Sequence, residues 1–236
     1  SSAASDVYKR QVFLDPYRLR SNCIPKTESL LRIPLPLVSQ LMEPDGIQKN
    51  SMRPWKRIQG ILRENMQYTG AYKLRGAYYK ISTLSEEERA KGLITASAGN
   101  HAQGVAYAAK AFGCKATIVM PTVTPLIKVN RTKSYGAEVI LHGDVYDDAC
   151  AKAYELAEEH GYTFVHPFDD LDVATGQGTI TMEIIQELPT VDYILAPIGG
   201  GGLITGVSTL AKMLNPKIKV CLLYTSDAAD DLIGVD

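Results

Sequence analysis

The chain has 236 residues, of which 45% are hydrophobic and 22% charged, and this balance is typical of a globular protein rather than a disordered or fibrous one. Its 25 lysines and arginines nearly cancel its 26 aspartates and glutamates, so the net charge of −1 offers no electrostatic footprint for nucleic acid or an anionic membrane. Apolar runs such as residues 116–120 are far shorter than the roughly 20 residues of a membrane span. We therefore expect no nucleic-acid or membrane partner, but a small molecule or a second copy of the chain.

The two ends of the chain differ from its middle. Residues 1–11 have neither the basic start nor the apolar core of a signal peptide, and the four cysteines are too widely spaced for a zinc knuckle or a redox pair. We therefore expect a reducing, cytoplasmic location. Residues 1–11 and 222–236 resemble translated vector sequence, and the proline-rich residues 34–60 lack a sustained period, so we interpret that stretch as partly garbled sequence.

From about residue 92 onward, β-branched runs alternate with helical periodicity, which is the pattern of an α/β protein with a parallel sheet and flanking helices. The predicted strands are residues 93–96, 116–120, 138–141, 162–165, 193–196 and 218–222. The predicted helices are residues 101–112, 125–135, 145–160, 176–188 and 203–214. Ser85 and Glu88 predict a capping box at the start of a further short helix.

Two loops between a predicted strand and a predicted helix carry small residues. The glycine loop consists of Gly199, Gly200, Gly201, Gly202 and Leu203. Its bare N–H groups and the helix behind it form a cradle for a phosphate. Ile204 breaks the dinucleotide GxGxxG spacing and Val207 stands where a P-loop needs lysine, so a smaller phosphate ester is favoured. The alternative is a merely flexible turn.

The other loop, called the serine loop below, consists of Ser97, Ala98, Gly99, Asn100 and His101. Ligands of a parallel sheet bind at the carboxyl ends of its strands, so both loops could face one cleft. Free backbone N–H groups here could take a carboxylate, and the Asn100 amide can donate and accept. The alternative is that Ser97 and Asn100 only cap a helix.

A lysine completes the set. Lys73 follows Tyr72 and has small residues around it; such a lysine is ordinarily solvated. A buried lysine together with a phosphate cradle and an asparagine loop, however, predicts a pyridoxal phosphate site, in which lysine holds the aldehyde as a Schiff base.

Five motifs occur in the order and spacing of the threonine dehydratases (threonine ammonia-lyases), and residues 62–220 resemble this family. The motifs are Tyr72-Lys73-Leu74-Arg75-Gly76-Ala77, residues 97–104, Pro167-Phe168-Asp169-Asp170, Gly176-Gln177-Gly178-Thr179 and the glycine loop. The resemblance implies the fold-type II (tryptophan synthase β-like) class of pyridoxal phosphate enzymes, with two domains built on open parallel sheets. It divides the chain into residues 12–66 of a larger domain, a small α/β domain at 67–165, and part of the larger, phosphate-binding domain at 166–221.

The resemblance also implies roles for these residues. Lys73 would form the Schiff base and take the α-proton, and Tyr72 would lie beside the cofactor. Asn100 would bind the ring's 3-oxygen, the glycine loop the phosphate, and the serine loop the substrate carboxylate. The implied reaction is dehydration and deamination of L-threonine, and of L-serine, to 2-oxobutanoate or pyruvate and ammonia, by a homo-oligomer.

Alternatives remain open at this point. His101 differs from the threonine of cysteine synthases, and Ala98 differs from the second serine of serine racemases, although a racemase or a hydroxyaspartate dehydratase of the same fold is not excluded. Ala71 stands where the family usually has serine. The family also continues past residue 220, so a truncated, non-catalytic fragment is a further alternative. The histidines at 142, 160 and 166 show no metal-ligand spacing, so we expect no metal and interpret them as surface or helix-end residues.

Overall fold

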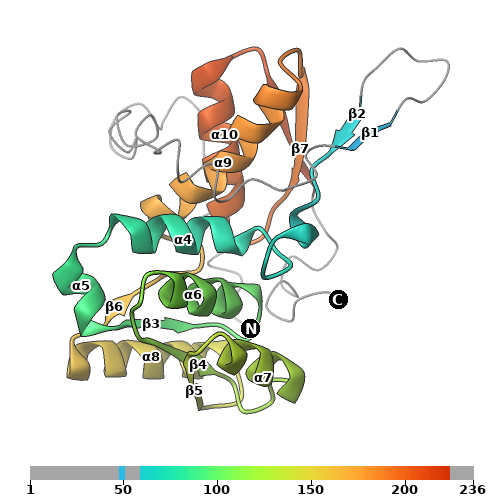
Figure 1. Ribbon diagram of the computed structural model, residues 1–236. Coiled ribbons are helices and arrows are strands. Elements are labelled where there is room, and N and C mark those ends of the chain that lie inside the picture. The colour runs from blue at the N-terminus through green and yellow to red at the C-terminus, as the bar shows by residue number, and fades with distance from the viewer. Residues whose placement is uncertain (1–47, 51–58, 224–236) are drawn as a thin grey trace.

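A computed structural model describes residues 48–50 and 59–223 of the chain (Figure 1). The predictions made for residues 1–11, for residues 224–236 and for most of 34–60 lie outside these ranges. The first described elements are the antiparallel pair β1 (Gln48–Asn50) and β2 (Gln59–Ile61), followed by the short helix η2 (Glu64–Met66). Among the described residues, no helix is long and apolar enough to cross a membrane.

A four-stranded parallel sheet forms the first half of the described chain, with the strand order β5-β4-β3-β6. Its strands are β3 (Leu93–Ala96), β4 (Ala116–Met120), β5 (Glu138–Leu141) and β6 (Thr163–Phe164). Every residue of β3 and β4 is buried, as expected for central strands that helices cover on both faces. The four strands lie where the sequence predicts them, although β6 is two residues shorter than expected.

Helices cover the two faces of this sheet (Figure 1). They are α6 (Asn100–Ala111), α7 (Leu126–Ser134) and α8 (Tyr146–His160). Successive strand residues enter opposite cores, because Leu93 and Ile118 pack with α6, whereas Ile94 and Val119 pack with α8. The predicted parallel α/β arrangement is therefore present here.

A second, two-stranded parallel sheet pairs β7 (Tyr193–Pro197) with β8 (Lys219–Leu223). The helices α9 (Leu171–Glu187) and α10 (Gly202–Leu214) belong to this half, and Ile194 of β7 packs into the core beneath them. The strand β8 extends to Leu223, which pairs with Pro197, so its last residues overlap the tail that the sequence suggested to be foreign. The division into domains at 67–165 and 166–221 stays a prediction.

The helix α4 (Lys73–Thr83) was not among the predicted elements, and it contacts both α6 and α9 (Figure 1). Charged and aromatic residues interrupt its apolar period, but its neighbours bury both of its sides. The short helix α5 (Glu86–Lys91) follows, and its predicted Ser85–Glu88 capping box is present in both directions. The helix α9 begins five residues before the predicted position, because Asp170 caps it by accepting hydrogen bonds from the N–H groups of Asp172 and Val173.

Glycines let these helices cross at close range. A Cβ on Gly76 of α4 would lie 2.6 Å from the Val173 carbonyl oxygen of α9, and one on Gly104 of α6 would lie 3.2 Å from the backbone of Leu74. A Cβ on Gly206 of α10 would collide with the Ala174 carbonyl. The absence of side chains at these crossings sets how near α4, which carries Lys73, lies to α6 and α9.

Candidate active site

Lys73 is the first residue of α4 and lies half-buried between two aromatic rings. Its Nζ donates a hydrogen bond to the Pro167 carbonyl at 2.9 Å, and it lies 5.5 Å from the Tyr72 ring centroid and 5.9 Å from that of Phe168. The sequence predicts a buried lysine, and the side chain is less enclosed than that. Its amine is nevertheless held at one place by a carbonyl and two π-faces.

A buried ion cluster anchors the first turn of α4. The Arg75 side chain is fully buried and donates to Glu64 at 2.7 and 2.8 Å, to Thr179 at 3.0 Å, and to Glu183 of α9. Burial opposes the charge of Arg75, but the two carboxylates outweigh it and raise the pKa of the guanidinium above its ordinary value. This cluster fixes α4 to α9 two residues beyond Lys73. No local sequence pattern indicates this role for Arg75.

The glycine loop runs from the end of β7 into α10. Gly201 is the N-cap of α10 and has φ +88°, in the left-handed region that favours glycine. A Cβ on Gly200 would lie 2.6 Å from a ring carbon of Phe168, and one on Gly202 would lie 2.8 Å from the Phe168 carbonyl oxygen. Close approach therefore requires glycine here, in contrast to the alternative of a merely flexible turn. The loop presents the N-terminus of a 13-residue helix, where an anion is stabilised.

Phe168 joins the two parts described so far. Its ring lies against the Lys73 amine and against Gly200, and its backbone lies against Gly202. Lys73 and Gly199, the first residue of the glycine loop, are 126 residues apart in the sequence, yet Lys73 and the loop both contact Phe168. The structure thus brings together Lys73 and the glycine loop, which the sequence predicts to belong to one site.

The serine loop lies between β3 and α6. The Ser97 Oγ accepts a hydrogen bond from the Gly99 N–H at 3.2 Å, and Gly99 is the N-cap of α6 with no side-chain cap. Asn100 begins the helix and is exposed, whereas Ala98 is half-buried. Neither Ser97 nor Asn100 is the N-cap residue, so the capping alternative does not describe this loop.

The His101 side chain lies inside the protein, with only 2% of its surface exposed. Its Nε2 donates to the Val165 carbonyl at 3.0 Å, while its buried Nδ1 has no hydrogen-bond partner. Burial and the nearby charge of Lys73 lower the pKa of His101 to about 3, so the imidazole is neutral at physiological pH. The His101 side chain therefore lies in the interior, and only the backbone of this part of the serine loop would bind a carboxylate.

The environment of His166 differs from the one that the sequence predicts. The sequence suggested a surface residue, but His166 is half-buried in the connection between β6 and α9, two residues before Phe168. Its Nδ1 accepts hydrogen bonds from the N–H groups of Phe168 at 3.3 Å and Asp169 at 2.7 Å. Burial lowers the pKa of this imidazole below its ordinary value, although Asp169 and Asp170 oppose the shift. Its position directly before the Pro-Phe-Asp motif is the signal that could have identified it.

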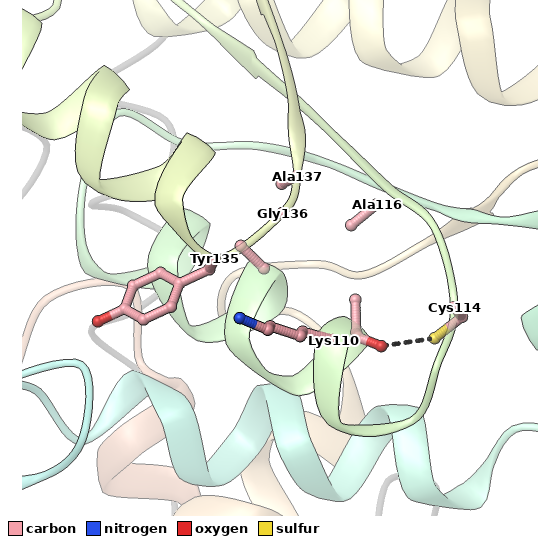
Figure 2. A pocket seen from close by; sticks show the side chains of 8 residues that line it. Lys110, Cys114, Ala116, Tyr135, Gly136 and Ala137 are labelled. Carbon is pink, nitrogen blue, oxygen red and sulfur yellow. Dashed lines mark hydrogen bonds between the residues drawn. The ribbon is translucent and has the colours of Figure 1, made fainter.

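A surface depression of about 210 Å³ lies elsewhere, and none of the predicted site residues lines it. Figure 2 shows Lys110, Cys114 and Tyr135 among the residues that line it, together with several alanines. The Cys114 thiol donates to the Ala109 carbonyl at 3.5 Å, and burial raises its pKa. Within the described part of the chain, no cluster of three or more histidine, cysteine or acidic side chains could hold a metal ion.

The fold and these motifs match a known class of enzymes. Residues 60–234 match the family described as pyridoxal-phosphate dependent enzyme, and the chain belongs to this family. The predicted fold class, an α/β fold-type II pyridoxal phosphate enzyme, is thereby confirmed.

The particular proteins to which the chain is similar include an L-threonine ammonia-lyase, a threonine deaminase and a serine racemase. The chain is 54% identical over 164 residues to the L-threonine ammonia-lyase of Thermotoga maritima, covering 70% of this chain and 41% of that protein. Among solved structures, it is similar to the processed form of threonine deaminase isoform 2 from Solanum lycopersicum (TM-score 0.72, 40% identity, 84% of this chain and 56% of that one). It is also similar to the serine racemase of Dictyostelium discoideum (TM-score 0.72, 37% identity, 77% and 60%). The chain thus spans less than half the length of the curated relative.

Proposed function

We propose that the full-length protein uses pyridoxal phosphate to convert L-threonine, and L-serine, to 2-oxobutanoate or pyruvate and ammonia. One observation carries the proposal: the Lys73 amine and the glycine loop both contact Phe168, so an amine and an anion cradle face the same residue. Pyridoxal phosphate has an aldehyde at one end and a phosphate at the other, and this pair of groups fits it. The identity to threonine ammonia-lyase supports the choice of substrate.

The residues present fit the cofactor in further respects. Tyr72 lies beside the Lys73 amine, the unpartnered Nδ1 of His101 offers a buried acceptor, and the glycine loop ends at a helix N-terminus. When bound, the cofactor supplies an electron sink for the carbanion that forms when the α-proton leaves. Asn100 would hold the 3-oxygen of the ring, and the backbone of the serine loop would hold the substrate carboxylate.

Lys73 would act as the base of the reaction. Its Nζ would take the α-proton of the substrate, and the Pro167 carbonyl and two aromatic rings hold this amine in place. Ala98 has no side-chain proton donor that could return a proton to the second face of the substrate. Loss of the β-hydroxyl is therefore favoured over racemisation.

The test is a comparison of Lys73→Ala with Lys110→Ala, a change at an exposed lysine of α6 that lies outside the candidate site. Lys73→Ala should reduce 2-oxobutanoate release from L-threonine by roughly 10²–10⁴-fold or more, because it removes both the covalent anchor and the base. Lys110→Ala should leave the rate unchanged. Borohydride reduction followed by peptide mapping should find the cofactor on Lys73, and its location on any other lysine would refute the assignment.

The protein's assembly and location are also part of the proposal. We infer a cytoplasmic homo-oligomer that takes a free amino acid as its small-molecule substrate. Sedimentation of the full-length protein tests the oligomer, and a monomer with full activity would contradict it.

A further inference from the structure

The connection between β6 and α9 contacts Lys73, His101 and the glycine loop. The Val165 carbonyl accepts from His101 Nε2 at 3.0 Å, and the Val165 N–H donates to the Ile94 carbonyl of β3 at 2.9 Å. Two residues further on, the Pro167 carbonyl accepts from Lys73 Nζ at 2.9 Å. Next in sequence, Phe168 underlies the glycine loop. The shape of this short segment therefore determines where the amine lies relative to the anion cradle.

His166 holds the segment in this shape. Its Nδ1 accepts two backbone N–H groups, those of Phe168 and Asp169, and thereby closes a turn around Pro167. Its ring also meets the Phe168 ring edge to face, with centroids 4.8 Å apart and planes at 85°. Since Nδ1 must be unprotonated to accept both bonds, the neutral imidazole carries its proton on Nε2.

We propose that His166 is a positioning residue that fixes the separation between the Lys73 amine and the glycine loop. The inference rests on the proposed function, because that separation matters only if one molecule spans both. Without the Nδ1 acceptor, the partly buried Phe168 N–H and the exposed Asp169 N–H lose their partner, and the Phe168 ring loses its edge contact. The Pro167 carbonyl, which holds the Lys73 amine, and Phe168, which lies against Gly200 and Gly202, would then shift together.

Asparagine and glutamine at position 166 distinguish the acceptor role of Nδ1 from an effect of side-chain size or polarity alone. The Oδ1 of asparagine is as many bonds from Cα as the Nδ1 of histidine, and asparagine commonly accepts from the N–H groups two and three residues ahead. The Oε1 of glutamine lies one bond further out and does not reproduce this acceptor. His166→Asn should therefore retain the turn, whereas His166→Gln and His166→Leu should lose it.

The first measurement needs no cofactor. In the cofactor-free full-length protein, amide hydrogen exchange at Phe168 and Asp169 should be faster in His166→Gln than in the wild type, and near the wild-type rate in His166→Asn. Unchanged exchange in His166→Gln and His166→Leu would overturn the inference, because Nδ1 would then not hold the turn.

The second measurement titrates the proteins with pyridoxal phosphate and with pyridoxal, which lacks the phosphate. His166→Gln should weaken pyridoxal phosphate binding by roughly tenfold to a hundredfold, the effect of leaving donors unsatisfied. It should weaken pyridoxal binding less, since pyridoxal does not span the two ends, and His166→Asn should restore affinity for both. If the wild type binds pyridoxal phosphate on Lys73 and His166→Gln binds it equally well, this inference alone fails. If the wild type does not bind it on Lys73, the proposed function fails and the inference with it.

Discussion

At the scale of single residues, the candidate site depends on groups that are kept uncharged by burial. The His101 and His166 imidazoles both lie near Lys73, and for both of them desolvation is the largest cause of a lowered pKa. An imidazolium at either position would face the positive charge of Lys73. Instead, the neutral imidazole of His101 donates to the Val165 carbonyl, and the neutral imidazole of His166 accepts from two backbone N–H groups.

This burial makes stability depend on pH. In the unfolded chain His101 binds a proton below its ordinary pKa of 6.5, whereas in the folded protein it does so only below about 3. The neutral imidazole therefore stabilises the fold fully above pH 6.5, and the stabilisation is lost as pH falls through this window, at about 1.4 kcal/mol per pH unit. His101→Gln should flatten the decline in unfolding free energy between pH 7 and pH 5, measured by urea denaturation. His142→Gln, at an exposed histidine, should not, and equal slopes for all three proteins would contradict the assignment.

Ala98 bears on the choice of reaction. The similarity to a serine racemase makes racemisation the second candidate activity, and we propose that Ala98, whose side chain has no acidic group, faces the second side of the substrate. Full-length wild-type protein should release 2-oxoacid and ammonia from L-serine far faster than it forms D-serine. Ala98→Ser should raise the share of D-serine, because the hydroxyl supplies a proton donor there. Chiral analysis of the products measures this share, and comparable racemisation by the wild type would refute the proposal.

At the scale of elements, the helices α4, α9 and α10 pack closely because glycines stand where they cross. Gly206 of α10 lies against the Ala174 carbonyl and 2.7 Å from the Gly178 nitrogen, measured from the Cβ it lacks. Backbone atoms cannot give way as the end of a flexible side chain can. The helix crossing, and with it the position of the glycine loop at the start of α10, thus requires glycine at 206.

The Gly206→Ala variant tests this crossing. Alanine favours helix over glycine by about 1 kcal/mol, but the new methyl group collides with backbone. Gly178→Ala is a matched control on the same crossing, because its Cβ would meet the Gly206 carbonyl at 3.2 Å, and it gains the same propensity. Gly206→Ala should be less stable than Gly178→Ala by roughly 1–3 kcal/mol in thermal or urea unfolding. Equal stabilities would show that the helices can move apart without cost.

At the scale of the whole molecule, the two sheets differ in how well they are covered. The central strands β3 and β4 are buried on both faces, whereas β7 buries Ile194 and Ala196 but exposes 48% of Tyr193 and 60% of Leu195. An uncovered apolar sheet face favours association. The curated relative from Thermotoga maritima is more than twice as long as the matched stretch, which occupies 41% of it.

We expect the 236-residue chain, expressed by itself, to associate and to be essentially inactive, and a longer chain carrying the rest of the family's fold to be active. Size-exclusion chromatography and 2-oxobutanoate assay of both chains measure this. Changing Tyr193 and Leu195 to glutamine should reduce association of the short chain. The same change at Leu126 and Ile127, which are 71% and 76% exposed on α7, should reduce it less. A monodisperse, fully active short chain would contradict the prediction.

The sequence by itself determined the elements whose signals are local. Periodicity and the glycines and prolines at their ends predicted β3, β4 and β5 without error, and a capping box predicted the start of α5. Ordered motifs predicted the family and its cofactor, because five spacings together are specific where each alone is not. The assignment of individual site residues still awaits the experiments above.

The tertiary structure decided what depends on neighbours distant in sequence. The helix α4 carries buried Arg75 because Glu64 and Glu183 neutralise it, and no local pattern can indicate partners 11 and 108 residues away. His166 is half-buried because Phe164 and Phe168 pack against its ring. The glycine loop requires Gly200 and Gly202 because Phe168 occupies the space that their side chains would need. Burial and close approach are properties of the packed chain, and for this reason the sequence identified the parts of the site but not what holds them together.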